Sequence, residues 1–250
     1  MSIPKGFGST RAITASVALA GLITVTACRK ASVDPAHSSA ETPTAARSNE
    51  EAFAAALNQL VSSGGDLIRL DHFFATDDHV EVLANVERLR VIRIDGGKLT
   101  PAAGRRLAEM PHLEQLHLRN VEFDDAFVQE VSQSRTLWLL NLAAANVSPA
   151  AVAQLAQMPQ LRQLRLAIPG GDNSYAAAVA SIQTLQSVHL IGIAITDEGL
   201  QELAQLPALQ SLYLDDTDIT DEGWVWLFEH RPGLHVHIDQ KHHDRDPQRH

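Results

Sequence analysis

Four histidines near the C-terminus are the residues whose type and spacing come closest to a metal site. They are His235, His237, His242 and His243, in the segment HVHIDQKHHDRD. Imidazole nitrogens suit zinc, copper and nickel ions, and alternate residues of a strand point to the same side, so the first two could share one ion. The composition of residues 240–250 nevertheless predicts a polar, His-rich, solvated tail, and we assign no metal ligand.

Catalytic chemistry has no comparable pattern. Acidic residues are dense in DDTDITDEG, Asp215 to Gly223, but Asp221 stands where the calcium loop of an EF-hand requires glycine. The sequence contains no nucleophile motif and no pair of carboxylates set by spacing for acid–base work. We therefore predict a protein that is not an enzyme and uses no cofactor.

The single cysteine of the chain, Cys28, follows a segment typical of export signals. Residues 1–27 contain two basic residues, no acidic residue and an apolar run from Ala12 to Val25. The letters VTAC that end at Cys28 resemble the lipobox of bacterial lipoproteins, whose cysteine is lipidated. The resemblance implies a signal peptide over residues 1–27 and a membrane anchor at Cys28. An ordinary signal peptide or an uncleaved anchor is the alternative. Because Arg29 follows instead of Asp, the resemblance favours the outer membrane or the surface of a bacterial envelope.

Two segments precede the periodic part of the chain. Residues 28–48 are rich in Ala, Ser, Thr and Pro, which predicts a disordered tether. Residues 49–65 begin with an amphipathic pattern that predicts an N-terminal helical cap. Without residues 1–27 the chain has 18 basic and 30 acidic residues, a formal net charge of −12. This acidity argues against nucleic acid as a partner.

A repeat of 24 residues dominates the sequence; ITDEG, for example, begins at Ile195 and again at Ile219. Two apolar columns recur with the same period. The first is Ile92, Leu116, Leu140, Leu164, Val188, Leu212 and Val236, and the second is Ile94, Leu118, Leu142, Leu166, Leu190, Leu214 and Ile238. The two columns lie two residues apart, as in a strand with one buried face, so the pattern predicts short strands lying side by side.

A third column predicts that a helix follows each strand. Its side chains accept hydrogen bonds from the free amides of a helix start: Thr76, Thr100, Asp124, Ser148, Asp172, Thr196 and Thr220. Pro101 and Pro149 occupy the first helical position in two repeats, where a missing N–H costs nothing. Aspartates such as Asp197 occupy it in others, where the helix dipole favours negative charge. One repeat buries too little apolar surface to fold alone, so the repeats must stack.

The unit L-x-x-L-x-L resembles the leucine-rich repeat family across residues 66–239, and the TDEGL text is similar to its bacterial and ribonuclease-inhibitor-like types. The resemblance implies an α/β fold: a horseshoe-shaped solenoid of about seven repeats, with a concave parallel β-sheet and convex helices. The sequence departs from the family at the position where many such repeats carry Asn, which here holds residues such as Val121, Ala145 and Ile193. We therefore expect a side-chain ladder between repeats to be largely absent.

The strand residues between the buried columns should face outward on the concave sheet. The candidate ligand-binding residues are Arg93, His117, Arg119, Trp138, Leu139, Asn141, Arg165, His189, Ile191 and Tyr213. Arg, Tyr and Trp are frequent at binding hot spots. We expect Leu139, Ala143, Ala167 and Ile191 to form a small apolar floor among the basic residues, which predicts a ligand with an apolar anchor and an acidic rim.

Two functions are compatible with the sequence. The first is a lipid-anchored cell-envelope protein that binds a protein or peptide through its concave sheet. The second is a structural or metal-associated envelope protein that uses its His-rich C-terminus and leaves the sheet idle.

Overall fold

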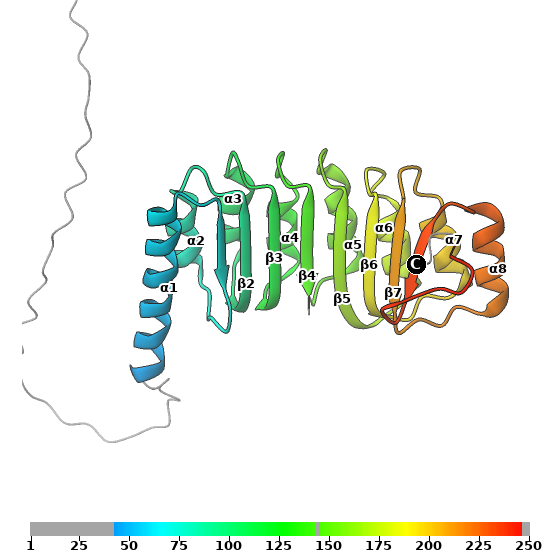
Figure 1. The fold of residues 1–250 in the computed structure, drawn as a ribbon, viewed down its shortest axis with the longest axis horizontal. Helices are drawn as coiled ribbons and strands as arrows, with labels where there is room; N and C mark the ends of the chain where they lie inside the picture. The colour runs from blue at the N-terminus through cyan, green and yellow to red at the C-terminus, as the bar shows by residue number, and fades with distance from the viewer. Residues whose placement is uncertain (1–42, 144–145, 247–250) are drawn as a thin grey trace, which may run out of the picture. The chain divides into compact units, whose positions relative to one another are not determined.

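The computed structural model describes residues 43–143 and 146–246, with side chains from Ser48 onward. These residues form one unit in which strands and helices alternate along the chain (Figure 1). The predicted signal peptide, Cys28 and most of the predicted tether lie outside the described residues. Among the helices that are described, none combines the length and the apolar character needed to span a membrane.

A 9-stranded sheet runs the length of the unit, with its strands in chain order. Strands β1 to β8 pair in parallel, and β9 pairs antiparallel with β8. The strands are β1 (Leu67–Leu70), β2 (Val91–Lys98), β3 (Gln115–Glu122), β4 (Leu139–Ala143), β5 (Gln163–Gly171), β6 (Ser187–Ile193), β7 (Ser211–Asp215), β8 (His235–Ile238) and β9 (Lys241–His242).

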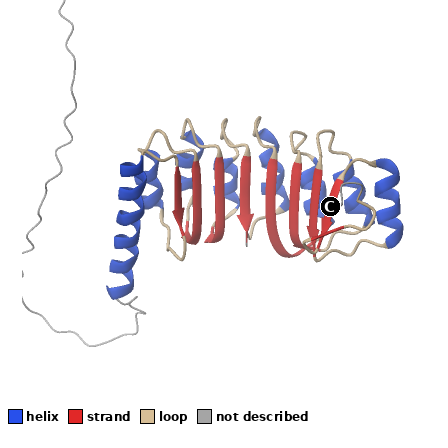
Figure 2. Cartoon of the chain, in the orientation of Figure 1, coloured by secondary structure: helices blue, strands red, loops and turns tan. Residues whose placement is uncertain are grey.

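Helix α1 precedes the first strand, and the later helices follow strands and lie on one side of the sheet (Figure 2). They are α1 (Pro43–Ser63), α2 (Asp77–Ala84), α3 (Pro101–Glu109), α4 (Asp125–Val131), α5 (Pro149–Gln154) with the 3-10 turn η1 (Leu155–Gln157), α6 (Asn173–Ala180), α7 (Asp197–Ala204) and α8 (Asp221–His230). The predicted fold class, an α/β solenoid with a parallel sheet on one side and helices on the other, is confirmed. The uncovered side of the sheet is called the sheet face below.

The predicted apolar columns form the core between sheet and helices. In the parallel register Leu116 pairs with Leu140 and Leu140 with Leu164, and the column continues through Val188 to Leu212. All five side chains are buried. Each strand thus covers the apolar residues of its neighbours, as stacking requires.

Helix α1 closes the first repeat, but it begins at Pro43 and not at the expected Asn49, so its first turns lie in the predicted tether. The segment PTAARS explains the difference, because Pro suits a first helical position and Ala favours helix. Phe53 of α1 stacks on Phe73, and His79 of α2 meets both rings edge-on. The Arg88 guanidinium donates to the carbonyls of Leu60, Val61 and Gly65 at the end of α1.

A side-chain ladder joins successive helices at their first residues, a different place from the position of Val121 and Ile193, where no Asn ladder was expected and where both side chains lie in the apolar core. The first residue of one helix accepts a hydrogen bond from the backbone N–H of the next repeat's N-cap residue and also bonds that residue's hydroxyl. For Asp197 and Thr220 the two distances are 2.9 Å and 2.7 Å. The same two bonds join Asp77 to Thr100, Asp125 to Ser148 and Asn173 to Thr196.

The ladder follows a rule that is visible in the sequence. Each of the four pairs of residues described above is one rung of the ladder. In the helix that follows the N-cap residue of a rung, the third residue is small: Ala103, Ala151, Gly199 and Gly223. A Cβ atom at either glycine would overlap the side chain that reaches across from the previous repeat. Where the first helical residue is Pro101 or Pro149, the next N-cap is an aspartate, which has no hydroxyl to donate, and the third residue is Phe127 or Tyr175. The repeated ITDEG therefore encodes both ends of a rung.

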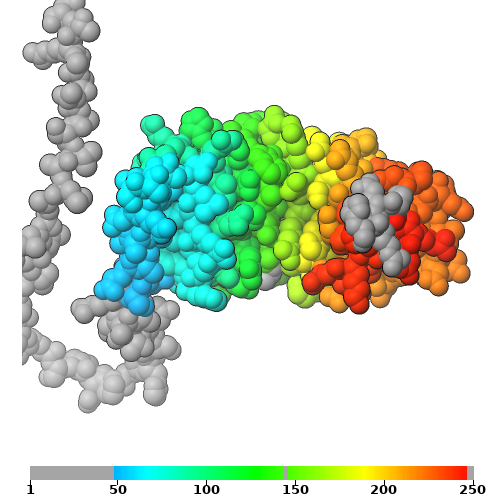
Figure 3. Space-filling view, viewed as in Figure 1, coloured from blue at the N-terminus to red at the C-terminus, as the bar shows by residue number. Residues whose placement is uncertain are grey.

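Residues 240–246 are folded onto the last repeat, which corrects the prediction that a solvated polar tail begins at residue 240; residues 247–250 lie outside the described residues. Asp239 and Gln240, both with positive φ, form a two-residue turn that leads into β9, as hairpins with a type I′ turn require. Asp246 is buried and accepts a hydrogen bond from the Val236 amide at 3.1 Å. Figure 3 looks onto the sheet face, where this red segment adjoins the yellow and orange surface of the last repeats.

Candidate functional site

Six of the predicted ligand-binding residues form one continuous row across the sheet face. Their register is set by strand pairing, so that each lies beside the next. The order is Arg93, His117, Asn141, Arg165, His189 and Tyr213. The parallel sheet thereby converts a spacing of 24 residues into a separation of about 5 Å between neighbouring strands.

The middle of the row is hollowed. A depression of about 240 Å³ is lined by His117, Leu139, Asn141, Arg165, His189 and Tyr213 together with Leu140, Gln163, Leu164 and Ser187. Asn141 is only 8% exposed, and its side-chain Oδ1 has no hydrogen-bond partner. Buried polar atoms are almost always satisfied. Because Asn141 lines the open hollow, a turn of its side chain would present this acceptor to a donor from a ligand.

Positive charge surrounds this amide. Arg165 lies beside it in the row, and Arg93 lies two strands away on the other side, beyond His117. Within the described part of the chain neither guanidinium has a carboxylate at ion-pair distance. Burial, and then the charge of Arg93, lower the pKa of His117 to about 4. His117 is therefore neutral at pH 7, so Arg165 supplies the positive charge of the hollow and Arg93 adds charge in the neighbouring depression.

His189 is held by an acidic neighbour that the sequence interpretation did not assign to the site. Its Nε2 lies 2.9 Å from Oδ2 of Asp215, which is buried at the end of β7. Asp215 also accepts a hydrogen bond from the Gln240 amide. The two partners lie 26 residues apart, which is one repeat of 24 residues plus two positions along a strand. Residues with this separation lie on the same face of adjacent strands, so the sequence spacing could have been used to pair them.

Arg119 lies in a second depression of the sheet face, lined by Arg69, Asp71, Arg93, Ile94, Asp95, His117, Arg119, Asn141 and Arg165. Its guanidinium is 3.8 Å from Asp95, which also accepts a hydrogen bond from Asn120 at 2.6 Å. Arg119 is thus partly neutralised within its own face, unlike Arg93 and Arg165.

The expected apolar floor does not form as one patch. Leu139 lies beside Gln115 and Gln163, on one side of the central row. Ala143, by contrast, lies on the other side of the row, where the register continues to Ala167 and Ile191. Asn141 stands between the two positions on β4, so a strand rise of about 3.3 Å per residue separates them by roughly 13 Å. Leu139 contributes to the hollow, and Ile191 does not line it.

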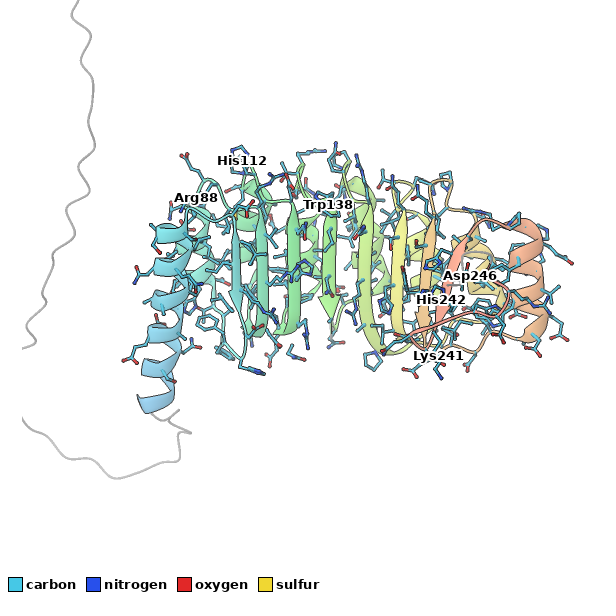
Figure 4. The ribbon with its side chains drawn as sticks, in the orientation of Figure 1. Arg88, His112, Trp138, Lys241, His242 and Asp246 are labelled. Carbon is cyan, nitrogen blue, oxygen red and sulfur yellow. The ribbon has the colours of Figure 1, made fainter. Side chains whose placement is uncertain are left out.

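Trp138 lies apart from the row, at the edge where the strands begin, the same edge on which Figure 4 labels His112 and Arg88. Its indole Nε1 donates to Glu114 at 3.4 Å, and Glu114 in turn pairs with Arg90 at 2.5 Å. The ring borders a separate depression lined by Pro111, His112, Glu114, Arg135, Thr136, Gln160, Arg162, Gln163 and Gln186. Trp138 is therefore not brought together with the other candidate residues.

Comparison with known proteins shows no family. No protein-family model matches the chain, and no curated protein matches its sequence. Among solved structures, internalin C2 from Listeria monocytogenes is similar at 16% identity, covering 76% of this chain and 92% of that one, with a TM-score of 0.49.

Proposed function

We propose that the protein is a binding module that holds an acidic, extended segment of another protein across the middle of the sheet face. The observation that carries the proposal is the unsatisfied Oδ1 of Asn141 in a row that also holds two arginines without an ion pair among the described residues. Arg165 lies beside Asn141, and Arg93 lies beyond His117.

The chemistry of the hollow defines the partner. Asn141 Oδ1 would accept an N–H, which every peptide backbone supplies. Arg93 and Arg165 would bind carboxylates, for which the planar guanidinium is well shaped. Leu139 and the Tyr213 ring offer apolar contact beside these groups. A peptide segment carrying Asp or Glu next to an apolar residue satisfies all three features, whereas an anionic small molecule lacks the apolar contact and the backbone donor.

The experiment is a quantitative pull-down from a cell-envelope extract with the double variant Arg93→Gln, Arg165→Gln. We expect the captured partner to be lost at least tenfold, and we expect its capture by the unchanged protein to weaken as salt is raised, because these charges are exposed and screened.

The matched control is the double variant Arg105→Gln, Arg106→Gln on α3, which removes the same charge from the helix side. Those arginines pair with Glu130 and Glu81 on the surface, and exposed pairs of this kind contribute little stability. Equal capture by the two double variants contradicts the proposal.

We also propose, from the lipobox-like sequence alone, that Cys28 is lipidated and anchors the module to the bacterial envelope, with the outer membrane or cell surface as destination. Replacing Cys28 by Ala should move the protein from the membrane fraction to the soluble fraction and abolish acyl labelling. Continued membrane recovery with an acyl label would contradict the anchor.

A further inference from the structure

The end of the solenoid gathers three histidines from two strands. His235 and His237 are alternate residues of β8, and the hairpin places His242 of β9 opposite His237. One ring nitrogen from each histidine lies within 4.8 Å of the others. The Nε2 atoms of His235 and His237 lie 3.1 Å apart.

These separations suit shared coordination. Two nitrogens bound to one tetrahedral zinc at about 2.0–2.1 Å lie roughly 3.3 Å apart. His235 and His237 already have nearly this spacing, and His242, whose ring nitrogen lies within 4.8 Å of theirs, needs to approach them. Strand β9 is only two residues long and lies at the edge of the sheet, so it can make that adjustment.

Asp246 lies behind two of the histidines (Figure 4 labels it with His242). Its Oδ2 is 2.9 Å from Nδ1 of His235 and 3.4 Å from Nδ1 of His242, and its side chain is fully shielded from solvent. Although the Asp246 carboxylate is close to Nδ1 of His235, the angles of the contact do not fit a hydrogen bond. This buried Nδ1 therefore has no hydrogen-bond partner in the described chain. Histidines that bind metals commonly present their other nitrogen to a carboxylate in this way, and the carboxylate leaves Nε2 for the ion.

We propose that His235, His237 and His242 form a binding site for a zinc-like divalent transition-metal ion, with Asp246 as the carboxylate that orients two of the rings. The inference goes beyond the binding of a protein segment at the centre of the sheet face and does not depend on it. Imidazole ligands select zinc, copper and nickel over magnesium and calcium. Three protein ligands leave one coordination position for water or an external donor.

The site would fasten the C-terminal segment to the last repeat. Its ligands come from both arms of the hairpin, and the His237 ring also lies against Tyr213, with ring centroids 4.8 Å apart. Metal binding would therefore stabilise the end of the solenoid and border the row of candidate ligand-binding residues.

The test is a titration of the full chain with zinc, in protein that carries no polyhistidine tag and has Cys28 replaced by Ala so that no thiol competes. We expect one zinc ion per chain, tetrahedral absorption bands when cobalt replaces zinc, and a rise in thermal stability with zinc. The variants His237→Ala and His242→Ala should each weaken binding at least tenfold.

Asp246→Asn should weaken zinc affinity by about 10- to 100-fold, as loss of an outer-shell carboxylate does elsewhere. The matched control is His112→Gln, an exposed histidine at the far end of the sheet in Figure 4, which should leave stoichiometry and affinity unchanged. Circular dichroism of each metal-free variant separates loss of ligands from loss of fold, and His242→Ala is the milder of the two because β9 is an edge strand. The proposal is overturned if the unchanged chain binds no zinc, or if folded His242→Ala binds it as tightly as the control.

Discussion

The ladder between helices predicts a specific cost for replacing Asp197 by Ala. The substitution removes two hydrogen bonds, to the backbone N–H and the hydroxyl of Thr220, at 2.9 Å and 2.7 Å. Hydrogen bonds to a charged group are worth about 1.5–3 kcal/mol each when shielded. Asp197 is only half-buried, so we take about 1 kcal/mol for each bond and about 0.5 kcal/mol for the charge at the helix start. The free energy of unfolding should fall by about 2.5 kcal/mol.

The chain supplies its own control for this prediction. Asn173 forms the same rung with Thr196, at 3.0 Å from the backbone amide and 2.7 Å from the hydroxyl. Asp197→Asn should therefore keep both bonds and cost less than about 1 kcal/mol, mainly the lost charge. Thr220→Val removes the hydroxyl side of the rung and also the N-cap bond that the hydroxyl accepts from the Gly223 amide. Combined with Asp197→Ala it should be less damaging than the sum of the single changes, by about 1 kcal/mol.

The assay is guanidinium denaturation followed by circular dichroism, with the midpoint interpreted at constant slope. A loss of 2.5 kcal/mol corresponds to a lowering of the melting temperature by about 5–10 °C in a unit of this size. The reasoning is refuted if Asp197→Ala costs less than 0.5 kcal/mol, or if Asp197→Asn is as destabilising as Asp197→Ala.

Three further predictions concern the core, the N-terminal cap and pH. Leu164→Ala should lower the free energy of unfolding by about 3–4 kcal/mol, because the side chain is 2% exposed in the central apolar column. In the same denaturation assay Leu67→Ala, at a side chain that is 44% exposed, should change it by less than about 0.5 kcal/mol. Arg88→Met should release the end of α1, and amide hydrogen exchange should accelerate in α1 while β4 and β5 keep their protection; uniform acceleration would contradict the local role of Arg88. His117 has a pKa lowered to about 4 in the fold, so the unfolded chain binds more protons between pH 6.5 and 4, and stability should fall as pH falls through that window. His117→Gln should remove about 1–2 kcal/mol of that fall, since the ring is partly open to solvent, and identical pH profiles for the two proteins would contradict the assignment.

The period of 24 residues was sufficient to predict the sheet and its register. Residues one period apart, such as Leu140 and Leu164, became partners on adjacent strands, because a constant repeat length places equivalent atoms side by side. The same logic predicted the central row of the sheet face from Arg93 to Tyr213.

Features that depend on diagonal or irregular contacts were not predicted. The ladder joins positions 23 residues apart, and its signal was the pairing of Asp or Asn at one helix start with Thr or Ser at the next. Composition alone described residues 240–250 as a tail, since it does not show that Asp246 is buried beneath His235. The prediction of one apolar floor from Leu139 to Ile191 was wrong because the two residues lie on opposite sides of the central row, two strand positions before it and two after it.

The most direct measurement of the central claim is photo-crosslinking from the sheet face. A photoreactive residue at Gln163, which is exposed and lines the hollow, is compared with one at Gln129, which is exposed on α4. The account predicts that Gln163 captures an acidic protein segment, that Gln129 does not, and that Arg93→Gln with Arg165→Gln abolishes the capture. Equal capture from both positions, or capture from Gln163 that survives the loss of both arginines, would contradict it.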